Sequence, residues 1–342
     1  MKKAFLALFQ LALTFALLWW VFHDPYKRQA LHDEFMQADW RWLVAGVGAY
    51  GVFEILAGIR WQILLRVQGI HITWWRLYGL VLVGLFFSLF SPGGTGGDII
   101  KGYYLLKEAP VGRKTSAALS VVMDRLLGLL GVAILLGAVT SARWKWLTSD
   151  PLIANCVYTS FAIIGVCVAG MIVAGLISGF RLVHALPEKL PGRGFVATLS
   201  GAYAVYARAW LPTAAAILIS IVAHTAHYTT FWCATKAIEA TGPSKPTALE
   251  IYSALPVIET VAALPITPGG LGTREKLFDE MLTPLANLSE GVAPAISVLG
   301  YLCIAFWGIV GGVFYMFYRP SRQERRAIFA ETRAQLKGTH LG

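Results

Sequence analysis

The sequence has 342 residues, of which 56% are hydrophobic and only 14% charged, and its mean hydropathy of +0.61 excludes an ordinary soluble protein. The formal net charge of +10 would suggest a nucleic-acid partner in a soluble chain. In a membrane chain it indicates positive-inside orientation and contact with anionic lipids, and we expect no nucleic acid. The sequence therefore predicts an all-α polytopic membrane protein with no separate catalytic domain.

Six apolar runs are about as long as a membrane-spanning helix requires. The first follows Met1-Lys2-Lys3, as in a signal peptide, but it is longer than a signal-peptide core and lacks an A-x-A-like cleavage site. We therefore expect it to be a retained span. The cysteines all lie inside apolar runs without metal-ligand spacing, so we expect no metal or cofactor. The six predicted spans are residues 4–22, 42–60, 115–140, 152–178, 210–235 and 294–318.

Two further apolar runs, Leu77 to Phe90 and Ser253 to Ile266, are only about 14 residues long, which suits a re-entrant segment better than a full span. Each ends in the same Pro-Gly-Gly-x-Gly kernel, at Pro92 to Gly96 and Pro268 to Gly272. Non-helical backbone is tolerated at membrane depth only where protein or a water-filled cavity satisfies it. The two kernels therefore predict a shared polar interior.

The distribution of Lys and Arg supports this layout. If both short segments return to the side from which they enter, 19 of these residues lie on the N-terminal side and 9 on the other, while Arg125 stays within a span. This bias predicts that both termini are cytoplasmic and that the chain lies in the cytoplasmic (inner) membrane. Residues 1–320 then form one membrane domain, and residues 321–342 form a basic cytoplasmic tail.

Three full spans separate the two kernels, and this odd number gives the kernels opposite orientations. The first hairpin enters from the cytoplasm and the second from outside. Such an inverted repeat of discontinuous helices commonly forms a substrate site near the bilayer midplane. We therefore predict about six full spans plus two re-entrant helical hairpins in an inverted repeat.

Ionisable residues inside apolar segments are costly and commonly functional. Glu54, Asp124, Arg125 and Glu259 are of this kind, as are His224 and His227. Asp124 and Arg125 point about 100° apart on a helix, so at least one should have a partner on another helix. Arg125 could contact an anion, with Glu54, Asp124 or Glu259 as its counter-charge or as a proton-coupled gate. The alternative is a set of interhelical salt bridges that never meet substrate.

The kernels could also bind an anion. Glycines let backbone N–H groups turn inward, and each kernel opens a predicted helix, at Asp98 to Leu106 and Thr273 to Leu282. A lipid phosphate would fit, although first-turn carboxylates would compete with it. Alternatively the kernels are hairpin tips without a ligand. The candidate substrate-binding residues are Glu54, Pro92, Gly93, Gly96, Gly97, Asp98, Lys101, Asp124, Arg125, Glu259, Pro268, Gly269, Gly270, Gly272, Arg274 and Glu275.

Three stretches together resemble the flippase-like family that is named after the transmembrane part of lysylphosphatidylglycerol synthase. They are Ser91 to Lys101, Val121 to Gly128 and Leu264 to Glu275. The resemblance implies a lipid-translocating bundle with two re-entrant helices and links to aminoacylated phospholipids or polyprenyl-phosphate-linked sugars. Lys101 stands where members often have arginine, which keeps the charge but loses the planar fork. We expect the aminoacyl-transferring domain of the synthases to be absent, and with it synthase activity.

The leading hypothesis is a transporter that moves an anionic phospholipid or a polyprenyl-phosphate-linked lipid between leaflets, its head group crossing a cavity between the kernels. Its partners would be membrane lipids. A second hypothesis is a membrane-embedded transferase that acts on a lipid-linked sugar with Glu259 or Asp98 as base. It would need a donor-binding region, and the longest cytoplasmic connection, about Gly179 to Ala209, has no metal or nucleotide signature. A third is an accessory subunit of envelope-biosynthesis enzymes.

Overall fold

The computed structural model describes residues 29, 32, 35–36, 38–91, 94–110, 113–179, 193–238, 246–264, 266–289 and 291–317. Throughout these residues the regular structure is helical, as the sequence predicts. The predicted first span, the basic tail, and Pro92 and Gly93 lie outside the described residues.

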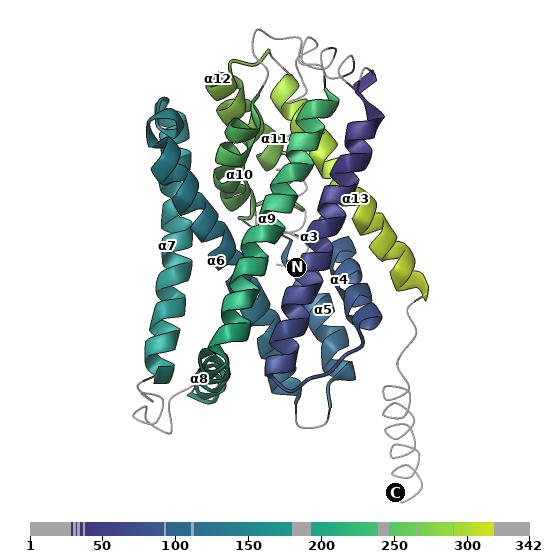
Figure 1. Cartoon of the computed structure of the whole chain (residues 1–342), viewed down its shortest axis with the longest axis vertical. Coiled ribbons are helices and arrows are strands. Elements are labelled where there is room, and N and C mark those ends of the chain that lie inside the picture. The colour runs from purple at the N-terminus through teal and green to yellow at the C-terminus, as the bar shows by residue number, and fades with distance from the viewer. Residues whose placement is uncertain are drawn as a thin grey trace, which may run out of the picture.

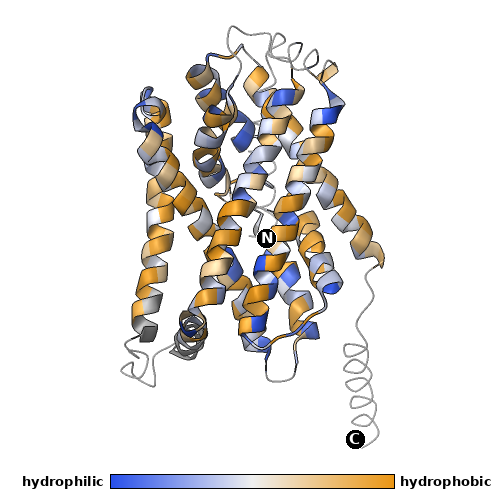
Figure 2. Cartoon of the chain, in the orientation of Figure 1, coloured by the Kyte–Doolittle hydropathy of each residue, from blue (hydrophilic) through white to orange (hydrophobic). Residues whose placement is uncertain are grey.

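Within the described part of the chain, five long helices are apolar enough to cross a membrane. Each coincides with one of the predicted spans, because a bilayer demands long unbroken apolar runs that the sequence displays directly. In Figure 2, hydrophobic residues cover α13 along most of its length. The long helices are α3 (Trp40–Val67), α6 (Lys114–Leu147), α7 (Pro151–Gly179), α9 (Trp210–Ala237) and α13 (Val292–Phe317).

The first short apolar run forms α4 (Trp74–Leu89), which turns at the first kernel and returns as α5 (Thr95–Glu108). Both helices lie in the lower half of the bundle in Figure 1. Gly97 allows them to pack closely, because a Cβ at this position would lie 2.1 Å from the Gly84 carbonyl oxygen. The hairpin therefore depends on a residue without a side chain at this contact.

The second short apolar run forms α10 (Ala248–Ala262), which lies with α11 and α12 in the upper half of Figure 1. Thr247 and Glu250 form a capping box at its start. The helix predicted from Thr273 to Leu282 is split into α11 (Thr273–Leu277) and a π-helical turn (Phe278–Leu282), followed by α12 (Thr283–Ala286).

The long helices hold the two short hairpins in place. α3 packs along α9, and α4 packs against α13. One further helix, α8 (Arg193–Arg208), lies within the long connection between α7 and α9. Its Tyr206 hydroxyl donates a hydrogen bond to the Leu64 carbonyl at 3.2 Å, which attaches α8 to the end of α3.

Candidate functional site

The two kernels meet inside the bundle. The Gly269 N–H donates a hydrogen bond to the Ser91 carbonyl oxygen at 3.0 Å. Ser91 lies two residues after the end of α4 and Gly269 lies seven residues after the end of α10, so the tips of a lower and an upper hairpin are in contact (Figure 1). The sequence predicts a shared interior for the kernels, and this contact places them side by side.

Two serine hydroxyls, of Ser88 and Ser91, form hydrogen bonds with the backbone of the first kernel. Gly94 has φ of 69°, a left-handed conformation that favours glycine. The Ser91 hydroxyl accepts a hydrogen bond from the Gly96 N–H at 2.8 Å, and the Ser88 hydroxyl donates to the Gly94 carbonyl at 2.9 Å. The Gly96 N–H, one of the groups considered for anion binding, is therefore already occupied by Ser91.

The second kernel uses three left-handed glycines, Gly269, Gly270 and Gly272, with φ of 56°, 75° and 83°. Pro268 accepts a main-chain hydrogen bond from Leu271 at 3.0 Å. The Glu275 carboxylate accepts one from the Gly272 N–H at 2.6 Å. Here a first-turn carboxylate occupies the position that an anion would take.

Arg274 and Glu275 form a buried ion pair behind the second kernel. Their side chains are 3.1 Å apart, and the Ser297 hydroxyl donates to the same Glu275 oxygen at 3.1 Å. The Arg274 guanidinium also lies 4.4 Å from the Tyr301 ring centre. With 4% and 1% of their surfaces exposed, these two charges neutralise each other inside the protein.

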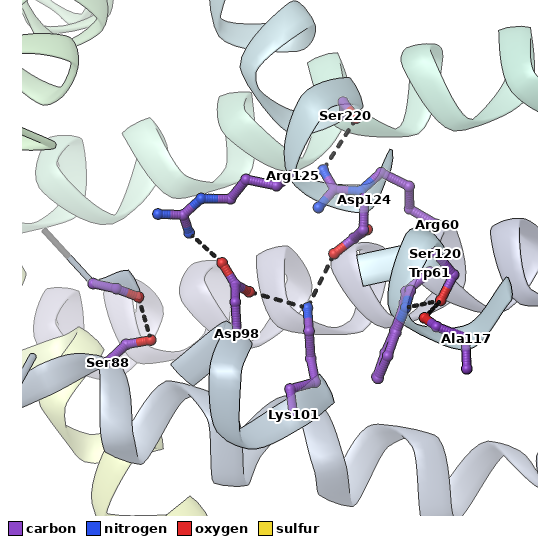
Figure 3. A network of polar contacts seen from close by, with 11 residues as sticks. Arg60, Trp61, Ser88, Asp98, Lys101, Ala117, Ser120, Asp124, Arg125 and Ser220 are labelled. Carbon is purple, nitrogen blue, oxygen red and sulfur yellow. Dashed lines mark hydrogen bonds and ion pairs between the residues drawn. The ribbon is translucent and has the colours of Figure 1, made fainter. Parts of the chain in front are cut away.

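A different arrangement of charges lies behind the first kernel. Asp124 of α6 accepts a hydrogen bond from Arg60 of α3 at 2.8 Å and another from Lys101 of α5 at 3.1 Å (Figure 3). Arg60 also donates to the Ser220 hydroxyl of α9 at 3.1 Å. The expectation that Asp124 has a partner on another helix is confirmed, and its partners join three helices.

Arg125 points to the other side of this cluster. Its guanidinium lies 2.8 Å from Asp98, which in turn lies 3.4 Å from Lys101. The counter-charge that the structure places against Arg125 is therefore Asp98, and not Glu54, Asp124 or Glu259 as the sequence analysis expected. The Arg125 side chain is 45% exposed and that of Asp98 28%, whereas those of Lys101 and Asp124 are 11% and 7% exposed.

These five side chains form a line of alternating charge: Arg125, Asp98, Lys101, Asp124 and Arg60 (Figure 3). We refer to it as the ionic line. It contains three cations and two anions, which gives a formal charge of +1. Its inner end is buried and hydrogen-bonded, and its outer end is the half-exposed Arg125.

Trp61 and Ser120 support the ionic line. The Lys101 ammonium lies 4.5 Å from the centre of the Trp61 ring, a cation–π contact. The Trp61 N–H donates to the Ser120 hydroxyl at 3.3 Å. Because Trp61 is fully buried, it fixes the direction of the Lys101 side chain.

Glu54 and Glu259 lie apart from these hydrogen bonds. Glu54 is buried on α3, one helical turn after Tyr50. Glu259 faces His227 of α9, with Oε1 and Nε2 3.7 Å apart. The structure therefore divides the candidate residues into the ionic line, the pair at the second kernel, and two further carboxylates.

The sequence analysis missed Arg60 because it ended the second span at residue 60 and assigned this arginine to a cytoplasmic loop. The structure corrects this assignment: α3 continues to Val67, and Arg60 is buried against Asp124. The apolar residues between Trp61 and Val67 are the signal that could have identified it. Trp61, Ser120, Ser220, Ser297 and Tyr301 carry no comparable signal, since each is an ordinary residue of an apolar helix.

Comparison with known proteins then identifies the family. Residues 7–312 match the family model described as the lysylphosphatidylglycerol synthase TM region. The chain belongs to this family. It is therefore a multi-pass membrane protein whose family is defined by a membrane-embedded region, as the three stretches of resemblance predict.

A distant relative agrees with this assignment. The chain is 25% identical over 135 residues to the UPF0104 membrane protein PH1989 of Pyrococcus horikoshii. The match covers 39% of this chain and 39% of the relative, so the chain spans well under half the length of that protein.

Proposed function

We propose that the protein is a flippase-like lipid transporter that moves an anionic phospholipid or a polyprenyl-phosphate-linked lipid across the cytoplasmic membrane. The observation that carries the proposal is the ionic line, which has an excess cation and ends in the half-exposed Arg125, paired with Asp98 shortly after the first kernel. A lipid phosphate is the natural ligand of an exposed guanidinium, because its oxygens match the planar fork of donors.

The arrangement of the hairpins supports the same proposal. α4 and α5 lie in the lower half of the bundle and α10 to α12 in the upper half, and their tips touch through Ser91 and Gly269. We propose that both are re-entrant and that they enter from opposite membrane faces. A head group that passes between the tips would then cross only a short distance in the protein, as in other inverted-repeat transporters.

The two kernels would serve different roles. Arg274 is neutralised by Glu275 and buried, so we assign this pair to structure. Arg125 is ion-paired with Asp98 but exposed enough to exchange that partner for a phosphate. We place the head group on the ionic line. We also propose that the side of the bundle with more Lys and Arg residues faces the cytoplasm, together with both termini.

The test is lipid movement in reconstituted liposomes. Lipids with a labelled phosphatidylglycerol or polyprenyl-phosphate head group should redistribute between leaflets faster with the protein than in protein-free vesicles. Arg125→Ala should abolish the acceleration, Arg125→Lys should keep part of it, and Lys236→Ala, at the end of α9, should behave as wild type. Movement at the protein-free rate for every tested lipid would refute the proposal.

The second candidate is a membrane-embedded transferase that acts on a lipid-linked sugar. Asp98 or Glu259 would then act as base. Mass spectrometry of the lipids recovered from the same liposomes separates the two functions, because a transferase changes lipid mass when a donor is supplied and a transporter does not. An accessory role would instead require a co-purifying envelope-biosynthesis enzyme for any effect.

A further inference from the structure

Glu259 and His227 form a second polar site, between α10 and α9. Their facing atoms are 3.7 Å apart, which is beyond hydrogen-bonding distance. In the part of the chain that the structure describes, Glu259 Oε1 and His227 Nδ1 are buried without a hydrogen-bond partner. Burial of such polar atoms without a partner is costly. The pair therefore gains stability from any donor that enters between the two side chains.

The surroundings of the pair favour a proton as that donor. The His227 ring lies 5.6 Å from Tyr50, 5.3 Å from Phe53 and 5.5 Å from Phe231, between ring centres. Among the described residues, no group of three or more His, Cys, Asp or Glu side chains could hold a metal ion here. An imidazole and a carboxylate, by contrast, can share one proton, and histidine changes its charge near neutral pH.

The other ionisable groups that face Glu259 do not replace histidine in this role. They are Tyr50 of α3, His224 and Tyr228 of α9, and Arg274 of α11. Arg274 is the permanent cation in this set, and its guanidinium is already bonded to Glu275 and Ser297. Asp124 and Glu275 differ from Glu259, because each accepts hydrogen bonds from a cation.

The position of Glu259 in α10 connects the pair to the second kernel. Pro256 lies inside this helix, one turn before Glu259, and proline removes one main-chain hydrogen bond there. On the near side of Pro256, the Tyr252 hydroxyl is 2.5 Å from the Thr229 hydroxyl of α9. After Pro256 and before the second kernel, Glu259 contacts His227 and so connects the second half of α10 to α9.

We propose that Glu259 and His227 form a proton-binding site that couples proton movement to lipid movement. One proton on the pair supplies an N–H or O–H donor between Nε2 and Oε1 and holds the second half of α10 against α9. Release of the proton removes this bond and frees α10 to bend at Pro256, which moves the kernel tip relative to Ser91. The coupling rests on the transport function proposed above, whereas the proton site does not.

Infrared difference spectra of the reconstituted protein between acidic and alkaline pH test the site without any transport. We expect a pH-dependent band of the Glu259 carboxyl group that disappears in Glu259→Gln, titrates at a clearly different pH in His227→Gln, and shifts least in His224→Gln. His224 is the matched control, since it lies on the same helix and its ring lies against Phe53, 5.8 Å away. Identical spectra for wild type and Glu259→Gln would overturn the proton site.

Liposomes with a pH difference test the coupling. For one proton per lipid, a difference of one unit should shift the leaflet distribution of the labelled lipid by up to about tenfold in wild type. Glu259→Gln should lose the shift at whatever rate it still exchanges lipid, whereas His224→Gln should keep the shift. A wild-type distribution that ignores the gradient would overturn the coupling. If wild type moves no lipid, the transport function fails, and the infrared result alone decides the proton site.

Discussion

Gly269 and Ser91 join the two halves of the molecule through one main-chain hydrogen bond of 3.0 Å. Each residue lies at the tip of a hairpin that comes from a different end of the bundle (Figure 1). The bond uses backbone atoms on both sides, so its geometry depends on main-chain conformation and close approach. Changes in the backbone at the tips are therefore the most direct way to test the arrangement.

Gly269→Ala should destabilise the protein. Gly269 has φ of 56°, and a Cβ there would lie 2.9 Å from the Leu89 carbonyl oxygen. A left-handed conformation costs a residue with a side chain about 1–2 kcal/mol. We expect a loss of roughly 2 kcal/mol in thermal unfolding of the purified protein. Gly137→Ala in α6 is the control, because a Cβ there meets nothing within 4 Å; equal melting temperatures for both variants would contradict the prediction.

The sequence predicts the helices of this fold more fully than its internal contacts. Lipid requires long apolar runs, so the five described long helices are visible as hydropathy alone. The contact between Ser91 and Gly269 has no such signal, because it depends on how distant segments meet in space. Arg60 is intermediate: it lies in a continuing apolar run, yet a basic residue at the end of a predicted span resembles a loop residue.

Breaking the inner end of the ionic line should be far more damaging than breaking a surface ion pair. Asp124→Asn leaves Arg60 and Lys101 facing each other without their shared anion, and loss of one partner from a buried pair costs about 3–5 kcal/mol. Lys276→Ala, which removes a 3.4 Å contact with Glu280 on a partly exposed surface, should cost about 0.5 kcal/mol or less.

Denaturant or thermal unfolding of Asp124→Asn, Arg60→Gln and the double variant measures the coupling between the two residues. The double variant should lose less stability than the two single losses combined, since Arg60 is then no longer buried without its anion and Lys101 no longer faces a second cation there. Additive losses would show that Arg60 and Asp124 act independently.

Gly97→Ala should open the hairpin of α4 and α5. The added Cβ would lie 2.1 Å from both the Gly84 carbonyl oxygen and the Ser88 hydroxyl, so the helices must move apart. Such overpacking costs about 1–3 kcal/mol. It would also move Asp98, the neighbour of Gly97, away from its position against Arg125. We expect lower thermal stability together with slower lipid movement. Gly102→Ala on the same helix, where a Cβ makes an ordinary 3.8 Å contact with Val121, should retain both properties.

The Glu275 carboxylate makes both a helix-capping bond and a buried ion pair. Glu250 makes a capping bond alone, so a comparison of the two residues separates the two contributions to stability. Glu250 makes the equivalent capping bond to the Thr247 N–H at 2.8 Å in an exposed position. Glu250→Ala should therefore cost about 1 kcal/mol, the value of a cap alone. Glu275→Ala also leaves Arg274 buried without its anion and should cost about 3–5 kcal/mol.

Glu275→Gln completes the comparison, because the amide oxygen can still accept the Gly272 N–H but carries no charge. We expect its loss of stability in thermal unfolding to approach that of Glu275→Ala, since the unpaired Arg274 dominates the cost. A loss much smaller than that of Glu275→Ala would mean that capping, not charge, is the main contribution of Glu275. In that case Arg274 would be neutralised by another anion, and the assignment of this pair to structure alone would be wrong.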